Sequence, residues 1–326
     1  MAKPVLLTVD DDPDVLRAVE RDLRKEYAEN YRVLRAESGA EALDLLRKLE
    51  QRNDPDSLAA AAVLLRFTQR TPDEPAAHAL IVRAVTLASG RADLAWLEIQ
   101  NCRLVPGCDP NPEEARLRGL DPANGVAWIN AMTRANEAND EAEKMAVLSA
   151  LAGSERVDVY YTTLTVHLTR SLMDTHKISL PNALVEVIGV LAGEAIPAFG
   201  ATSGMCMGER LNDVAILRDC QRVAAAMEWG DTVLTENLGV AIARRVWPAE
   251  SPEWRAAVEA RRVYEYRQQL WIHSEMASLG ESRWAERYLA LCAQNHREQD
   301  VWLAAFTAEG RSPDPPPDWA PGTTVP

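Results

Sequence analysis

The chain has little that would attract nucleic acid or an anionic membrane surface. It carries 35 Lys and Arg residues against 49 Asp and Glu residues, which gives a formal net charge of −14. No cluster of basic residues reverses this balance locally. Because nucleic acid phosphates and acidic lipid headgroups repel such a surface, we expect neither of them as a partner.

Long uninterrupted hydrophobic runs are also missing. The most apolar stretch, residues 180–199, approaches membrane-spanning length, but Glu186, Glu194 and Pro197 interrupt it and no basic flank orients it. We therefore expect no membrane span, and a buried helix over residues 183–196 at the centre of the core. The first residues lack the features of a secretion signal, so the chain as written is predicted to be cytoplasmic.

The familiar catalytic motifs are absent as well. The sequence has no GxGxxG, CxxC or HExxH pattern, no nucleophile elbow and no metal-spaced set of Cys and His, which favours a non-catalytic protein. An enzyme would have to gather the following residues into one cleft: Tyr264, Tyr266, His273, Glu275 and Glu236. His273 and Glu275 are two residues apart, so they would not face each other on a helix.

Cysteine is scarce, but four of the five cysteines fall into two pairs. Cys102 and Cys108 bracket a Pro-Gly turn, and Cys206 and Cys220 flank the beginning of a predicted helix. Both pairs could form disulfides in an oxidising compartment, whereas in a reducing compartment they would be four buried thiols. Spacing leaves both interpretations open. Cys292 lies among apolar residues and is predicted to belong to the core.

Proline recurs at the expected helix starts. Asp54, Glu74, Asn111 and Asp121 each precede a proline, whose missing N–H costs nothing in the first helical turn. Apolar residues recur at helical spacing between these starts. We therefore predict a mainly α fold built as an array of helical hairpins. The array resembles tetratricopeptide repeats, chiefly from Asp121 to Trp128.

Four other segments carry specific expectations. A helix over residues 157–173 has His167 at its apolar edge, which we interpret as a core-edge residue rather than a ligand. Ser251, followed by Pro252, is expected to cap a long helix over residues 254–278, whose apolar stripe suits a neighbouring antiparallel helix or self-association. Residues 200–208 are rich in small side chains and are expected to form a linker. Residues 311–326 are expected to form a proline-rich tail along the surface, held through Trp319.

The first fifty residues follow a different pattern. Short apolar runs at residues 5–9 and 31–36 indicate strands, and helical spacing at residues 13–27 and 38–49 indicates helices, in the order βαβα. The stretch KPVLLTVDDDPDVLRAVERDLRKEYAENYRVLRAESGAEALDLLRKL resembles the opening of a response-regulator receiver domain. In particular it resembles the receiver that is fused ahead of thioredoxin-reductase-type flavoproteins.

This resemblance predicts a metal site, but it covers only part of a receiver domain. It implies that Asp10 and Asp11 match the acidic pair that helps a receiver to hold Mg²⁺. The match ends near Asn53, before the strand that would carry the phosphoacceptor aspartate. An apolar helix former follows there instead. The segment is therefore predicted to be a truncated, receiver-like fragment.

The remainder of the chain also resembles an uncharacterised family of helical bacterial proteins. The likeness rests on GDTVLTENLGVAIARRVWP and on EQDVWLAAF followed by a proline-rich tail. It implies an exported, periplasmic-type helical domain, which is the alternative to the cytoplasmic location and would suit the two cysteine pairs.

These observations predict three parts: a receiver-like segment at 1–53, an all-α domain at 54–310 with an optional division near 155–180, and the tail at 311–326. The favoured function is a non-catalytic helical binding or scaffold protein with a protein or peptide partner. A two-component phosphorelay regulator and an enzyme in the helical domain are the alternatives. No cofactor is expected except Mg²⁺ at Asp10 and Asp11.

Overall fold

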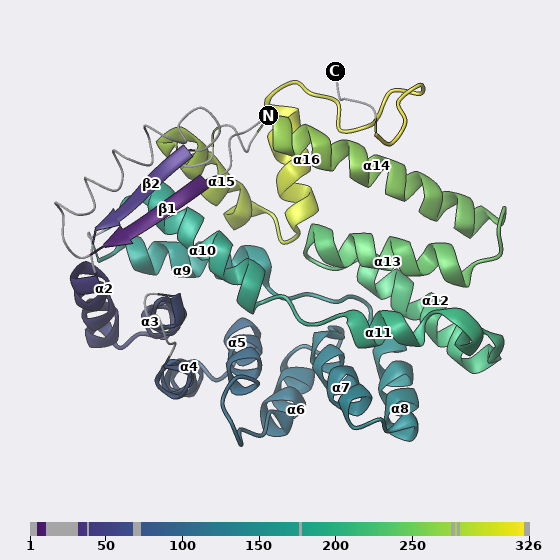
Figure 1. The fold of residues 1–326 in the computed structure, drawn as a ribbon, viewed down its shortest axis with the longest axis horizontal. Helices are drawn as coiled ribbons and strands as arrows, with labels where there is room; N and C mark the ends of the chain where they lie inside the picture. Colours follow the sequence, from purple (N-terminus) through teal and green to yellow (C-terminus); the bar gives the residue numbers. More distant parts are fainter. Residues whose placement is uncertain are drawn as a thin grey trace.

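The computed structural model describes residues 5–10, 32–37, 39–67, 73–175, 178–274, 278 and 281–322, and over these residues the chain is mainly helical (Figure 1). The elements in chain order are β1 (Val5–Asp10), β2 (Arg32–Glu37), α2 (Gly39–Arg52), α3 (Pro55–Phe67), α4 (Glu74–Leu87), α5 (Ala92–Cys102), α6 (Asn111–Leu120), α7 (Val126–Glu137), α8 (Glu141–Ala152), α9 (Tyr161–Met173), α10 (Leu180–Glu194), α11 (Gly200–Met205), the 3₁₀ helix η1 (Gly208–Asn212), α12 (Val214–Glu228), α13 (Val233–Val246), α14 (Pro252–Ser274), α15 (Ser282–Gln294) and α16 (Glu298–Ala308). None of these helices is both long and apolar enough to cross a membrane.

The two strands pair with each other in parallel, with Val5 opposite Arg32 and Asp10 opposite Glu37. The helix expected over residues 13–27 lies outside the described residues, so the receiver-like interpretation stays a prediction. Helix α2 does belong to the core, because Leu49 is fully buried and α2 packs against α3 and α9. Beyond these strands, the described part of the chain contains one isolated β-bridge and no further strand.

Successive helices pack against each other in chain order. From α2 to α8 each helix contacts the next, and these helices form a row along the lower half of Figure 1. Helix α12 packs against α8 and continues the row, and α13 and α14 follow it towards the top of the figure. Later helices of the same chain cover one side of this row: α9 lies on α3, α10 on α5, and α11 on α7. Much of the surface that an open hairpin array would offer to a partner is therefore occupied by the chain itself.

The main hydrophobic core extends from the row of helices α2–α8 into helices α9 and α10, which cover it. Trp96 of α5 is fully buried, and its Nε1 donates a hydrogen bond to the Ala195 carbonyl just after α10, at 3.0 Å. The prediction that α10 forms the centre of the core holds for one face only. Ala183 and Val187 are fully buried, whereas Gly189 on the opposite face is exposed. Helix α10 packs against α9, α15 and α5 on its buried side and is not surrounded by helices on all sides.

Three local predictions were wrong. Asp121 does not begin a helix, because the chain turns there and α7 begins only at Val126. Asn111 is the first residue of α6 rather than its cap, and the Asp109 carboxylate accepts a hydrogen bond from its N–H instead. The expected linker at residues 200–208 contains α11, which is tied down by the buried Met205.

Two other predicted starts are confirmed. The Asp54 carboxylate accepts a hydrogen bond from the Ser57 N–H at 2.9 Å, and the Ser251 hydroxyl accepts one from the Trp254 N–H at 3.1 Å. The apolar stripe of α14 meets helices of the same chain. Helix α13 packs beside it, and Trp271 stacks on Trp302 of α16 with ring centroids 5.1 Å apart.

Two glycines test this packing. A Cβ at Gly239 of α13 would lie 2.6 Å from the Glu228 nitrogen and 2.8 Å from the Ala224 oxygen, both backbone atoms of α12. Gly189, in the exposed face of α10, has nothing within 4 Å of such a Cβ. We expect Gly239→Ala to lower the free energy of unfolding by about 1–3 kcal/mol, and Gly189→Ala to raise it by about 0.5–1 kcal/mol.

Urea denaturation of both variants measures these two effects. If Gly239→Ala were as stable as the wild-type chain, the close approach of α12 and α13 would be wrong.

Candidate functional site

The predicted site residues do not form a single site. Asp10 ends β1, but its side chain and the whole of Asp11 lie outside the described residues. The four paired cysteines form two disulfides, Cys102–Cys108 and Cys206–Cys220. The interpretation as four buried thiols is therefore wrong for this structure.

Cys292 is a buried free thiol, as predicted. Burial raises its pKa to about 12, so at neutral pH it is protonated and unreactive.

Of the residues that an enzyme would need, Tyr264 and Glu236 lie near each other, since burial raises the pKa of Tyr264 and the charge of Glu236 adds to this effect. The other described ones have separate surroundings. His273 is exposed, and its Nδ1 contacts the Gln269 carbonyl of its own helix. Tyr266 is buried beneath the proline-rich segment, and Glu275 lies outside the described residues. Glu236 is on α13, where burial raises the pKa of its carboxyl group.

His167 pairs with Asp56 of α3, its Nδ1 lying 3.0 Å from the carboxylate. This contact agrees with a role at the edge of the core.

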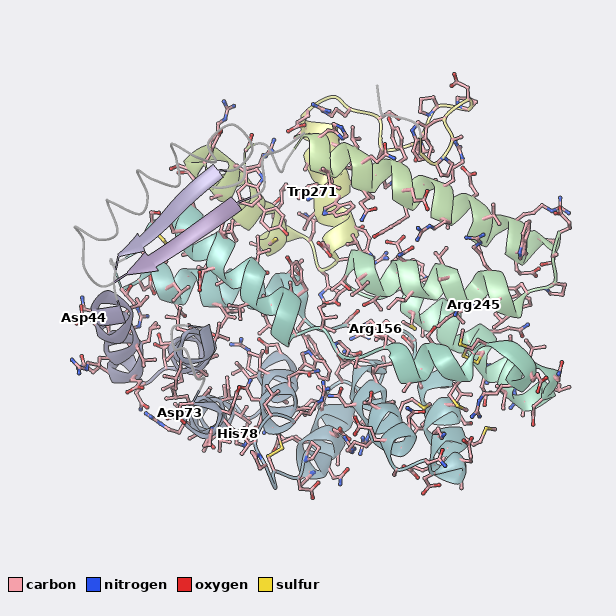
Figure 2. All side chains as sticks on the ribbon, in the orientation of Figure 1. Asp44, Asp73, His78, Arg156, Arg245 and Trp271 are labelled. Carbon is pink, nitrogen blue, oxygen red and sulfur yellow. A yellow bond between two sulfur atoms is a disulfide. The ribbon has the colours of Figure 1, made fainter. Side chains whose placement is uncertain are left out.

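A buried polar cluster lies near the middle of the molecule, around Arg156 (Figure 2). Its centre is Asp231, which is completely buried in the turn before α13. One carboxylate oxygen accepts a hydrogen bond from the Val159 N–H and the other from the Tyr161 N–H, both at 2.8 Å. One side chain thereby holds the extended segment that leads into α9.

A second buried carboxylate, Asp158, organises the rest of the cluster. Its Oδ2 accepts a hydrogen bond from Nε of Arg156 and lies 2.9 Å from Nε2 of His296. Arg156 also binds both oxygens of Asp121, at 2.8 Å each. Asn124 completes the connection, since its side chain binds both the N–H and the carbonyl of Asp158. The charge of Arg156 is thus shared between two carboxylates.

Tyr160 has an unusual backbone conformation within this cluster. Its φ of 60° and ψ of 32° are left-handed, a region that costs a non-glycine residue about 1–3 kcal/mol. The two amides that Asp231 holds flank this residue directly. Its hydroxyl donates to Asp121 at 2.9 Å and accepts from Asn124 at 3.1 Å. The surrounding hydrogen bonds therefore fix the conformation that the backbone alone would avoid.

The cluster is better suited to joining elements than to catalysis. Both oxygens of Asp231 accept hydrogen bonds from main-chain N–H groups, so this side chain holds the backbone of the segment ahead of α9 in place. His296 is half exposed, and its ring is oriented by the buried Asp158 carboxylate. This histidine–carboxylate pair is the one part of the cluster that would suit acid–base chemistry. The His296 carbonyl accepts a hydrogen bond from Thr162, which ties the α15–α16 connection to α9.

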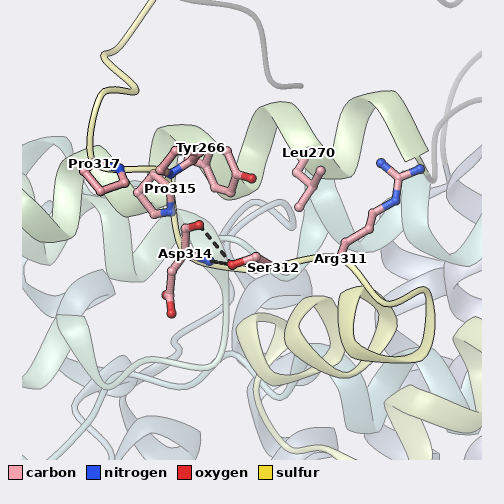
Figure 3. Close-up of a pocket in the computed structure, with 8 residues that line it drawn as sticks. Tyr266, Leu270, Arg311, Ser312, Asp314, Pro315 and Pro317 are labelled. Carbon is pink, nitrogen blue, oxygen red and sulfur yellow. Dashed lines mark hydrogen bonds between the residues drawn. The ribbon is translucent and has the colours of Figure 1, made fainter.

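A second site lies on α14, where the proline-rich segment docks (Figure 3). A cavity of about 530 Å³ lies between Tyr266 and Leu270 of α14 and residues 311–317. Trp319 is buried at the end of this segment, its ring 5.3 Å from that of Tyr266 in an edge-to-face contact. The predicted surface tail, held through Trp319, is confirmed for residues 311–322.

Two arginines of α14 bind the main chain of this segment. Arg262 donates to the carbonyls of Pro316 and Trp319, at 3.2 and 3.0 Å, and Arg267 donates to that of Pro313 at 3.1 Å. The Glu259 carboxylate binds the other two nitrogens of the Arg262 guanidinium at 2.8 and 2.9 Å, which fixes its orientation. The face of α14 therefore combines an aromatic side chain, Tyr266, with oriented hydrogen-bond donors.

Comparison of the chain with protein-family models, with curated proteins and with solved structures gave no match. The candidate site therefore rests on its geometry.

Sequence reasoning missed most of these groups. Asp158 was expected inside the helix over residues 157–173 and Asp231 at the start of the helix that follows Gly230, whereas the structure places both in the connections ahead of α9 and α13. Arg262 and Arg267 stand on one long helix with many other charges, where a solvated position is the usual expectation. The only sequence signal for the α14 site was the cluster of prolines ahead of Trp319.

Three groups, Asp231, Glu298 and His296, should make the free energy of unfolding decrease as the pH rises, because the pKa of each is raised in the folded chain. Burial raises the pKa of Asp231 to about 7, with Asp158 adding to the effect, and burial raises that of Glu298 to about 7. The hydrogen bond to Asp158 raises the pKa of His296. In each case the folded chain keeps a proton that the unfolded chain has lost.

The free energy of unfolding should therefore fall as the pH rises from about 4.5 to about 7.5, by up to about 1.4 kcal/mol per pH unit for each proton. Glu298→Gln should flatten this dependence, since glutamine can still accept from the Val233 N–H but does not titrate. Glu141→Gln is the control, because hydrogen bonds from Arg210 and Lys144 hold the pKa of this carboxyl at about 2, below the window. Urea denaturation across the pH series measures both, and equal slopes for Glu298→Gln and the wild-type chain would contradict this assignment.

Proposed function

We propose that the protein is a non-catalytic helical binding protein that takes up a proline-rich peptide on the face of α14. The hairpin array of tetratricopeptide character serves as its framework, and the truncated receiver-like segment as an end piece. The observation that carries this proposal is the docking of residues 311–322 on α14. This segment occupies the face as a bound peptide would.

The chemistry of the segment supports recognition by main-chain acceptors. Residues 313 and 315–317 are prolines, which have a carbonyl but no N–H. A surface that binds such a segment needs donors rather than acceptors, and Arg262 and Arg267 supply them. Proline-rich peptides also lose little conformational freedom on binding, and aromatic side chains suit their flat apolar rings.

The alternatives have less support. The phosphorelay alternative has only the resemblance of the first fifty residues behind it. An enzyme would have to work at the exposed His296 beside Asp158, where the neighbouring groups already form hydrogen bonds with one another.

The proposal predicts binding in trans once the chain's own segment is loosened. Trp319→Ala in the full chain removes the aromatic anchor, and a fluorescent peptide with the sequence of residues 311–322 should then bind α14. The wild-type chain should bind this peptide at least about tenfold more weakly, because its own segment competes at an effective concentration in the millimolar range. Fluorescence anisotropy measures both affinities.

Two further substitutions locate the binding. Adding Arg262→Ala to Trp319→Ala should abolish binding, since the donors to two carbonyls are lost. Adding Arg255→Ala is the matched control, because Arg255 lies on the same helix and donates only to the Glu250 carbonyl. Absence of binding to Trp319→Ala, or equal binding by both double variants, would refute the proposal.

A further inference from the structure

Three metal-ligating side chains meet at the edge of the hairpin row, far from α14 in the sequence. They are His78 of α4, Cys102 at the end of α5, and Cys108 in the connection to α6. One ligand atom from each lies within 4.8 Å of the other two. Figure 2 shows His78 close to the yellow bond of the Cys102–Cys108 disulfide. These residues come from different elements, so the packing of α4 on α5 brings them together.

The imidazole of His78 has no ordinary hydrogen-bond partner among the described residues. Its Nδ1 is buried and unpaired, and its Nε2 lies 3.5 Å from Sγ of Cys108. A disulfide sulfur carries no proton and is a weak acceptor. Nε2 is therefore the ring nitrogen that faces the sulfur and that a metal ion at this place would bind.

The two disulfides differ in their access to solvent. Cys206 and Cys220 are both fully buried. Cys102 is buried, but Cys108 is partly exposed in a loop whose Pro106 and Gly107 are also exposed. Thiol–disulfide exchange requires a thiolate to reach one of the sulfurs, so a reductant reaches Cys108 first. The Cys102–Cys108 bond is therefore the more readily reduced of the two.

The spacing fits a tetrahedral zinc site once this bond is open. Bond lengths of about 2.3 Å to sulfur and about 2.0 Å to nitrogen place sulfur and nitrogen ligands roughly 3.5 Å apart and two sulfurs roughly 3.8 Å apart. His78 and Cys108 already have the first of these separations. Two thiolates, one imidazole and one water form a ligand set that Zn²⁺ takes in proteins, and soft thiolates favour this cation over Mg²⁺ or Ca²⁺.

We propose that reduction of the Cys102–Cys108 disulfide creates a Zn²⁺ site formed by His78, Cys102, Cys108 and a water molecule. A dithiol reductant transfers two electrons and two protons to the disulfide, which yields two protein thiols and the oxidised cyclic disulfide of the reductant. Zn²⁺ then displaces one proton from each thiol, and both protons go to solvent. Metal binding at this edge is thereby controlled by the thiol–disulfide state.

Zinc titration of the full chain tests the proposal, with a chromophoric chelator as competitor and a phosphine as the reductant. The reduced wild-type chain should bind one Zn²⁺ with at least about a hundredfold higher affinity than the oxidised chain. His78→Ala should weaken binding at least about tenfold, and Cys102→Ser with Cys108→Ser should abolish it. Cys206→Ser with Cys220→Ser is the matched control and should leave the site intact.

A second measurement needs no substitution. Zn²⁺ should protect Cys102 and Cys108 from alkylation in the reduced chain, as mapped by peptide mass, whereas it should not change the extent to which the buried Cys206 and Cys220 are alkylated. Cd²⁺ in place of Zn²⁺ should give a thiolate-to-metal charge-transfer band in the ultraviolet. Equal affinity of the oxidised and reduced chains, or no selective protection of the first pair, would overturn the proposal.

Discussion

The buried carboxylate of Asp231 is the constraint on which the arrangement of the helices depends. Its two hydrogen bonds to the Val159 and Tyr161 N–H groups fix the segment where the chain leaves the first helical row and enters α9. Its own carbonyl accepts from the Glu298 N–H, at the beginning of α16. A single residue thus joins three parts of the chain that are distant in sequence. Because removing such a carboxylate leaves buried amides unpaired, its energetic effect exceeds that of its two bonds alone.

The hydrogen bonds of Asp231 help to explain why later helices of the chain cover one side of the row α2–α8. A stack of hairpins that ended at α8 would leave one side of the row free for a partner. Here the left-handed Tyr160 turns the chain back over the row, so that α9, α10 and α11 cover that side. The inner surface is therefore part of the core, and the peptide binding that we propose takes place elsewhere. The face of α14 lies outside this cover, and a segment with no regular secondary structure occupies it.

Sequence patterns predicted the helices well where local chemistry decides them. Asp54 and Ser251 cap helices through bonds to residues three positions later, an interaction that is visible in the sequence. Asp121 has the same local signature, yet it binds Arg156, which is 35 residues away. A carboxylate followed by proline is equally suited to both uses, and only the fold decides between them. The buried cluster is built mainly from such long-range pairs, so the local sequence pattern could not predict it.

The same distinction applies to the two cysteine pairs and to the site on α14. Spacing along the chain made both disulfides feasible, but it is the packing of α4 on α5 that places His78 beside Cys102–Cys108. On α14, the prolines ahead of Trp319 indicated a surface segment, whereas the donors that hold it are ordinary helical arginines. What makes Arg262 specific is Glu259, one turn earlier, which occupies two of its nitrogens and leaves the third directed at the carbonyls of Pro316 and Trp319. Recognition of a proline-rich chain therefore depends on the orientation of a charge rather than on its presence, and orientation is set by tertiary contacts that composition does not record.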